Sequence, residues 1–293
     1  MKRTLAAATA AALLAASFPA PALDIGGLIN KAIDTGSKLK EANRDFSQDE
    51  EVQLGDNIAA TLLGGWPLSK DANLQRYVNR VGRWVALQSE RPDLPWTFGV
   101  IDAQTVNAFA MPGGTVLVSR GLIDKLGNES ELAGALAHEI AHVVLKHQLS
   151  AIRSSANADV WASVGQQAAG ERIARTGGGY IAHVGEGALA NLAIDSVKNG
   201  VFLRPLDRSM EYQADRMGVI LATRAGYDPY GLAGVLEVLG TMQGDGSGID
   251  IMETHPAPSD RLAELEKLMP AVEGYANQPR LEGRFMQVVG RAK

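Results

Sequence analysis

A pair of histidines four residues apart, in the segment His138-Glu139-Ile140-Ala141-His142, constrains this chain more than any other feature. Residues i and i+4 of a helix project from one face, so both imidazoles can reach one metal ion at the ~2.0–2.1 Å of zinc–nitrogen bonds. Glu139 then lies one step round the helix, where it can act as general base toward a metal-activated water without binding the metal. Two unrelated surface histidines are the alternative. That alternative is disfavoured by the apolar residues that recur around the segment at helical spacing, which are Leu132, Ala135, Leu136, Ile140, Val143 and Val144.

The helix that carries these histidines is predicted to begin near Asn128, because a glutamate three residues later completes a capping box. We expect it to continue to about Gln148. His147 lies nine residues after His138, about half a turn away in azimuth. It is therefore expected to point away from the metal and to serve packing or the helix C-terminus. His183, in a stretch of weak patterning, is not expected at the site.

A catalytic zinc ion needs a third protein ligand and an open position for water. The chain has no cysteine, so the ligand must come from histidine or a carboxylate. In Glu211-Tyr212-Gln213-Ala214-Asp215 two acidic residues again have helical i,i+4 spacing. Glu211 can ligate the metal while Asp215 orients a ligating imidazole through its second nitrogen. Such a pair is usually a solvated helix face, and it is persuasive here because a two-histidine site requires a carboxylate.

The N-terminus predicts export. Lys2 and Arg3 precede an apolar, alanine-rich run that ends at Ala16, and Ala20-Pro21-Ala22 fits a signal-peptidase site. We therefore expect residues 1–22 to be a signal peptide, and the mature protein to be periplasmic. An N-terminal membrane anchor is the alternative, but the run is short for a ~30 Å hydrocarbon core. Membrane association without a span is left open.

Charge and patterning set the remaining expectations. A formal net charge of −5 argues against nucleic acid as the main partner, because phosphate binding needs a concentrated basic face. Apolar periodicity predicts an α+β, mainly helical fold. The expected divisions are a leader arm over 23–48, one catalytic domain over 49–273 and a C-terminal tail over 274–293. Helices are expected at 50–63, 72–89, 208–224, 228–242 and 258–268, and strands at 96–101 and 115–119, whereas 149–207 is the least readable stretch.

Three segments together resemble one family. The His138–His142 segment, the Glu211–Asp215 segment and the upstream Asn107-Ala108-Phe109-Ala110-Met111-Pro112-Gly113-Gly114 are similar to motifs of the HtpX, BepA and CAAX-prenyl-protease group of gluzincin zinc metallopeptidases. The resemblance spans about 49–273, with the motifs in the family's order. It implies a zincin-like fold with a small antiparallel sheet whose edge strand binds substrate. Members with membrane helices or a helical repeat domain differ from this chain, which looks like a stand-alone, exported member.

The resemblance also implies roles for single residues. It implies that His138, His142 and Glu211 bind one Zn²⁺ per chain, and that Glu139 is the general base. Asp215 would support the ligands. An edge strand can hold an extended peptide by main-chain hydrogen bonds, which suits a protease with little side-chain preference. The residues that the resemblance places on this substrate strand are Asn107, Ala108, Phe109 and Ala110.

His255 lies in Thr254-His255-Pro256, which resembles a family stretch whose histidine can bind the metal as a fourth ligand. Occupying the water position would make His255 an off-switch. The simpler alternative is a loop histidine before a helix that starts with proline. Arg261, farther along, could steady this loop or a substrate carbonyl, but a surface ion pair is favoured.

The favoured function is zinc-dependent endopeptidase cleavage of unfolded or misassembled exported proteins. The metal chemistry supports hydrolysis, whereas the quality-control role comes only from the resemblance. One alternative is a zinc-binding, chaperone-like module in which His255 caps the site and turnover is small. A structural envelope protein with a stabilising metal is disfavoured, because closed structural zinc sites normally use cysteine. Aminopeptidase or small-molecule hydrolase activity is compatible with the same ligands.

Overall fold

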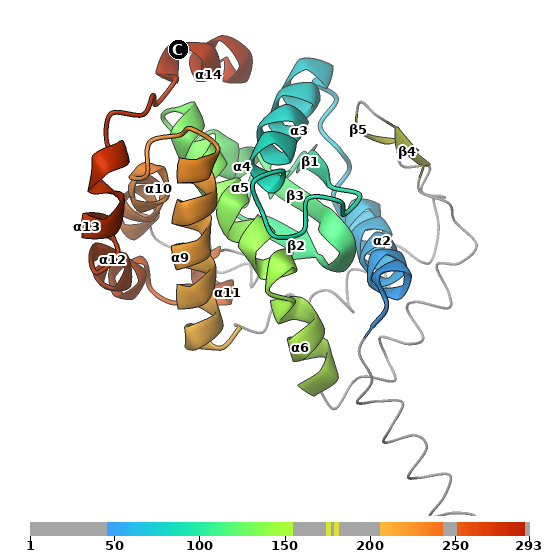
Figure 1. Cartoon of the computed structure of the whole chain (residues 1–293). Helices are drawn as coiled ribbons and strands as arrows, with labels where there is room; N and C mark the ends of the chain where they lie inside the picture. The colour runs from blue at the N-terminus through green and yellow to red at the C-terminus, as the bar shows by residue number, and fades with distance from the viewer. Residues whose placement is uncertain (1–45, 155–173, 177–178, 182–205, 243–250, 291–293) are drawn as a thin grey trace, which may run out of the picture. The chain divides into compact units, whose positions relative to one another are not determined.

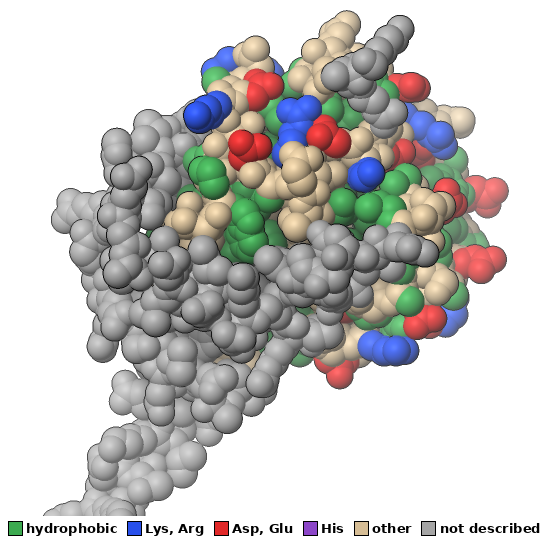
Figure 2. Space-filling view, turned by 180° about the vertical axis from the view of Figure 1, so that it is seen from behind, with side chains coloured by type: hydrophobic (Ala, Val, Ile, Leu, Met, Phe, Trp, Pro, Cys, Tyr) green, Lys and Arg blue, Asp and Glu red, His purple; other side chains and the backbone are tan. Residues whose placement is uncertain are grey.

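The computed structural model describes residues 46–154, 174–176, 179–181, 206–242 and 251–290 (Figure 1). The predicted signal peptide, the leader arm up to residue 45 and His183 lie outside the described residues. Within the described part of the chain, no helix combines the length and the apolar character needed to cross a membrane. On the face seen in Figure 2, Lys and Arg side chains are interspersed with Asp and Glu side chains.

Helices dominate the described residues, and the predicted mainly helical α+β class is confirmed. The central sheet has three strands, β1 (Thr97–Ile101), β2 (Ala108–Met111) and β3 (Thr115–Ser119). Its order is β1-β3-β2, with β3 in the middle. β2 pairs with β3 antiparallel, but β1 pairs with β3 parallel. The prediction of an antiparallel sheet is therefore wrong in this respect, because the chain crosses over after β1 and the sheet is mixed.

The sheet lies between helices on both faces. The longer helices of the described chain are α2 (Gln48–Gly65), α3 (Ala72–Ala86), α5 (Glu129–Val144), α9 (Arg208–Arg224) and α10 (Gly231–Gly240). Alternate strand residues face opposite sides. Phe109 and Met111 of β2 pack with the apolar residues of α2, whereas Ala108 and Ala110 pack with α3 and α5. β2 is therefore held between α2 and α5.

The two edges of the sheet differ in how their outward main-chain groups are covered. Along β1, the side chain of Asn79 accepts the N–H of Phe98, and Gln75 both accepts from and donates to the main chain of Val100. These contacts from α3 close the β1 edge, which would otherwise offer unpaired main-chain groups. β2 forms the opposite edge. It is followed by the turn η1 (Pro112–Gly114), where Gly113 has a φ of 79°, as the predicted tight turn requires.

α5 is the buried centre of the described chain, and α9 packs directly against it (Figure 1). Gly218 permits this approach, because a Cβ there would lie 3.0 Å from the main-chain nitrogen of His138. The predicted end of α5 near Gln148 is wrong. The helix ends at Val144, Lys146 takes a left-handed φ of 58°, and α6 (His147–Ser154) begins as a separate helix.

The C-terminal segment docks onto the N-terminal end of α5. The shorter elements of this segment are α11 (Ile251–Thr254), α12 (Pro258–Glu266), α13 (Met269–Val272), η3 (Glu273–Tyr275) and α14 (Glu282–Val289). Elsewhere in the described chain, α4 (Arg120–Ile123) follows β3, and β4 (Ala174–Thr176) pairs antiparallel with β5 (Gly179–Ile181). Residues 274–290, expected in a tail, include α14, whose Phe285 is completely buried in the main core. Arg284 of α14 pairs with the buried carboxylate of Glu129, which also accepts hydrogen bonds from the hydroxyls of Tyr77 and Tyr227.

Phe285→Ala should lower the free energy of unfolding by about 3–5 kcal/mol, because it opens a cavity where α14 meets α3 and α5. Urea unfolding followed by circular dichroism measures this change. Gln287→Ala in the same helix removes an exposed side chain and should alter stability by less than about 0.5 kcal/mol. Equal effects of the two substitutions would contradict the docked position of α14.

Candidate metal centre

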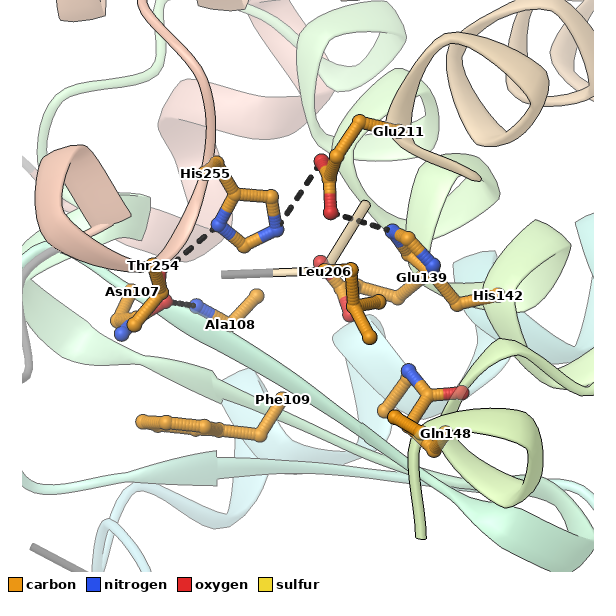
Figure 3. A pocket seen from close by; sticks show the side chains of 12 residues that line it. Asn107, Ala108, Phe109, Glu139, His142, Gln148, Leu206, Glu211, Thr254 and His255 are labelled. Carbon is orange, nitrogen blue, oxygen red and sulfur yellow. Dashed lines mark hydrogen bonds and ion pairs between the residues drawn. The ribbon is translucent and has the colours of Figure 1, made fainter. Parts of the chain in front are cut away.

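Four side chains from three parts of the chain converge at one point. His138 and His142 come from α5, Glu211 from the first turn of α9, and His255 from the residue after α11. Each offers one ligand atom, and these atoms all lie within 4.8 Å of one another. In Figure 3, His142, Glu211 and His255 point toward one another at the rim of a cavity. The fold therefore brings together His138, His142 and Glu211, which the sequence spacing indicated, and His255, which the resemblance indicated.

The distances between these atoms suit a single ion. Two atoms bound to one tetrahedral zinc lie about 3.3 Å apart. Nε2 of His138 and Nε2 of His142 are 3.0 Å apart, and each lies 3.6 Å from an oxygen of Glu211. Nε2 of His255 lies 3.7 Å from Glu211 Oε2. Three imidazoles and one carboxylate form a nitrogen–oxygen donor set of the kind that zinc accepts.

The carboxylate of Glu211 is the strongest sign that a cation belongs here. Both of its oxygens are buried, and neither receives a hydrogen bond from the residues that the structure describes. Burial, with smaller contributions from Asp215 and Glu139, raises the pKa of Glu211 to about 8 despite the opposing charge of Arg261. A buried polar group without a partner is costly, and a bound metal ion would supply the missing partner. The residues present therefore fit a divalent metal.

Glu139 lies on the same helix, next to the first histidine, and its carboxylate lines the cavity of about 50 Å³ at the centre. Only 4% of the residue is exposed. Burial raises the pKa of Glu139 to about 7, although the charge of Arg261 acts in the opposite direction. A carboxyl group with a pKa near neutrality can both take up and release a proton under physiological conditions.

Asp215 lies one turn after Glu211 and contacts the rear nitrogen of His138. Its Oδ1 is 2.9 Å from His138 Nδ1, so that His138 can donate there while its Nε2 faces the other ligands. Burial alone would raise the pKa of Asp215, but the charge and hydrogen bonds of Arg261 and the bond from His138 hold it well below its ordinary value. Asp215 is therefore an ionised acceptor.

The preferred interpretation of Arg261 as a surface ion pair is wrong. Arg261, on α12, is only 3% exposed, and its Nε and Nη2 atoms donate to the two oxygens of Asp215 over 2.9 and 2.6 Å. Its Nη2 also lies 3.2 Å from His138 Nδ1. The sequence carries no local sign of this contact, because Arg261 is far from Asp215 along the chain.

His147 is expected to point away from the metal, and it is not among the ligand atoms, but the structure places it closer to the centre than helical spacing predicts. Because α5 ends early, the first residue of α6 turns back, and His147 Nδ1 lies 2.9 Å from His142 Nδ1. His147 does not belong to the group of ligand atoms that could hold the ion. Burial lowers its pKa to about 4, so the ring is neutral at physiological pH.

The segment expected to form a substrate strand lines the same cavity. Asn107, Ala108, Phe109 and Ala110 line it together with Glu139 and His142. In Figure 3, Asn107, Ala108 and Phe109 lie across from Glu139 and His142. Ala108 donates its N–H to the side chain of Asn107 over 2.8 Å. Thr254 Oγ1 lies 2.9 Å from Nδ1 of His255, so the loop histidine presents its other nitrogen to Glu211.

Comparison with known proteins agrees with these observations. Residues 72–269 match peptidase family M48. The beta-barrel assembly-enhancing protease of Escherichia coli is 29% identical over 248 residues, which are 83% of this chain and 49% of that protein. The mitochondrial metalloendopeptidase OMA1 of Schizosaccharomyces pombe is 31% identical, over 67% of this chain and 53% of that protein. The metalloprotease YcaL of Escherichia coli is 28% identical, over 90% of this chain and 95% of that protein.

The chain spans about half the length of the first two of these relatives and nearly all of the third. The matched region, 72–269, contains the four converging side chains, Glu139, Asp215 and Arg261. The family match covers well over half of the chain. The fit of the family to the site, together with this coverage, shows that the chain belongs to peptidase family M48.

Proposed function

We propose that this protein is a zinc-dependent endopeptidase in which His138, His142 and Glu211 hold the metal and Glu139 is the general base. The observation that carries the proposal is the buried carboxylate of Glu211, which faces two imidazoles and has no hydrogen-bond donor among the described residues. The family membership and the metalloprotease names of the relatives support the same reaction.

When bound, a zinc ion at this site supplies a Lewis acid that makes a water molecule more acidic and polarises the peptide carbonyl. The carboxylate of Glu139 accepts the proton that the water loses as it attacks the carbonyl carbon. Glu139 then delivers that proton to the leaving amine nitrogen as the carbon–nitrogen bond breaks. Burial raises the pKa of Glu139 above its ordinary value, which helps this group to hold the proton between the two steps.

The substrate is proposed to bind as an extended strand beside β2. Ser119 donates its N–H to the carbonyl of Asn107, so alternate residues of β2 turn their main-chain groups toward β3. By this alternation, the main-chain groups of Ala108 and Ala110 face the outer edge, where the cavity lies. The β1 edge is covered by α3, so β2 is the edge that can take up a peptide.

A peptide can add to a strand only when it is extended and not part of a folded structure. We therefore propose unfolded or misassembled proteins as substrates. The name of the beta-barrel assembly-enhancing protease links that relative to the assembly of beta-barrels. The charged and apolar pattern of residues 1–22 agrees with export to the periplasm. Together these observations support a role in the quality control of exported proteins.

A second candidate function is a zinc-binding, chaperone-like module with little turnover, in which His255 occupies the fourth metal position. His255 Nε2 lies 3.7 Å from Glu211 and belongs to the same group of ligand atoms as the two helix histidines. A fourth protein ligand would occupy the position that a water needs. We therefore propose His255 as a switch that lowers turnover until its loop moves.

Glu139→Gln should lower the rate of casein hydrolysis by at least about 10²-fold, because the amide cannot accept the proton from water. Zinc content, measured by atomic emission after gel filtration, should stay at one ion per chain. Glu266→Gln makes the same chemical change at an exposed position and should leave the rate unchanged. Equal hydrolysis by wild type and Glu139→Gln would exclude the protease assignment.

Ala110→Pro should raise the KM for an unfolded substrate about threefold to tenfold, because it removes one outward main-chain donor worth about 1 kcal/mol. Zinc content should not change, since this N–H does not bond to β3. Ala110→Gly retains the donor and is the matched control. If both variants keep the wild-type KM, the peptide does not bind along β2.

His255→Ala should increase the rate of casein hydrolysis and weaken zinc binding, because it opens the fourth position and removes one donor. Steady-state assays and competition with a chelator measure the two effects. The double variant with Glu139→Gln should be inactive, which shows that any gained rate uses the same site. If His255→Ala leaves the rate unchanged, and the visible absorption spectrum of the cobalt-substituted protein is also unchanged, His255 does not act as a switch.

A further inference from the structure

A histidine outside the ligand group contacts the rear of a proposed ligand. Nδ1 of His147 lies 2.9 Å from Nδ1 of His142, with ring centroids 5.1 Å apart and ring planes at 71°. His147 is only 4% exposed, so the contact is shielded from bulk water. Two imidazole nitrogens at this distance form a hydrogen bond in which one must donate and the other accept.

The break between α5 and α6 that creates this contact is held by residues of α2 and of the segment that follows α3. Arg91 forms a bidentate ion pair with the buried carboxylate of Glu51, over 2.7 and 2.9 Å. It also donates to the carbonyl of Val143 near the end of α5. Lys146, the residue with left-handed backbone, lies 3.8 Å from the same carboxylate. The position of His147 is therefore built into the fold by α2 and is not a chance loop conformation.

The direction of the hydrogen bond follows from the role of His142. Its Nε2 faces Glu211 and His138, so this nitrogen offers its lone pair to the metal and the ring proton lies on Nδ1. His142 is then the donor, and Nδ1 of His147 is the acceptor. The proton of His147 then lies on Nε2, and the side chain of Gln213 on α9 interacts with this ring in the sense that raises its pKa.

The two histidines of α5 are thus supported in parallel ways. His138 donates through Nδ1 to Asp215, and His142 donates through Nδ1 to His147. Gln213 and Asp215 lie two residues apart on α9, the helix that also carries Glu211. A partner on the rear nitrogen fixes the tautomer and the ring orientation of a ligating histidine.

We propose that His147 is a positioning residue that holds His142 in the tautomer and orientation needed for metal binding. This inference rests on the proposed zinc site. The acceptor behind His142 is the neutral ring of His147, whereas the acceptor behind His138 is the ionised Asp215. His147 therefore orients His142 without adding negative charge to the centre. No feature of the sequence pattern assigns this role, since helical spacing places His147 on the opposite side.

The test compares three substitutions in the full-length protein. Asn carries its side-chain oxygen near the position of Nδ1 and should preserve the acceptor, whereas Gln carries it one bond farther out, and Leu has none. Zinc dissociation constants are measured by competition with a chromophoric chelator. His147→Leu and His147→Gln should weaken zinc binding about 10–100-fold, and His147→Asn should stay within about threefold of wild type.

A second readout separates positioning from folding. The cobalt-substituted proteins should show altered visible bands for His147→Leu and wild-type bands for His147→Asn, because these bands report ligand geometry. Thermal unfolding of the metal-free forms, with chelator present, controls for general stability. If His147→Leu does not fold, the amide pair His147→Asn and His147→Gln decides the question.

Wild-type zinc affinity and cobalt bands in His147→Leu would overturn the positioning role while leaving the proposed function intact. Equal losses in the Asn and Gln variants would overturn it as well, because the place of the acceptor would then be irrelevant. If the wild-type protein binds no zinc at all, the proposed function and this inference fail together. Restoration by Asn alone supports the inference.

Discussion

The buried carboxylate of Glu211 is the constraint on which the centre depends. It lies against α5 with no hydrogen-bond donor among the described residues, and its burial opposes ionisation. Arg261, whose positive charge acts on Glu211, is already engaged by both oxygens of Asp215. A bound cation would therefore supply the partner that the buried carboxyl group of Glu211 lacks, and the imidazoles of His138 and His142 face the place where that cation would lie.

Close packing of α5 and α9 makes this arrangement possible. Gly218 brings the main chains of the two helices together at the turn that carries His138, which sets Glu211 and Asp215 on either side of that imidazole. Because these side chains come from two helices that pack against each other and are themselves buried, their positions depend little on loops. The exception is His255, which reaches the centre from the segment between α11 and α12. A loop position is what a movable fourth ligand requires.

The sheet contributes through the difference between its edges. The β1 edge is closed by polar side chains of α3, and the β2 edge borders the cavity that contains Glu139. Side chains of Ala108 and Ala110 are small and pack toward α5, which brings the strand close to the helix that carries the histidines. The same closeness would place an added peptide strand beside Glu139, the proposed general base.

The sequence by itself determined the features that depend on local periodicity. The i,i+4 spacing of His138 and His142, and of Glu211 and Asp215, sets each pair on one face wherever the helices lie, and the Pro-Gly-Gly turn sets the end of β2. Only the tertiary structure decided the rest. The parallel pairing of β1, the burial of Arg261 and the return of His147 to His142 arise from chain crossings, long-range ion pairs and an early helix end. No local pattern encodes these features. β1 and β3, and Arg261 and Asp215, are distant in the sequence, and the helix end before His147 is held by Arg91, which pairs with Glu51.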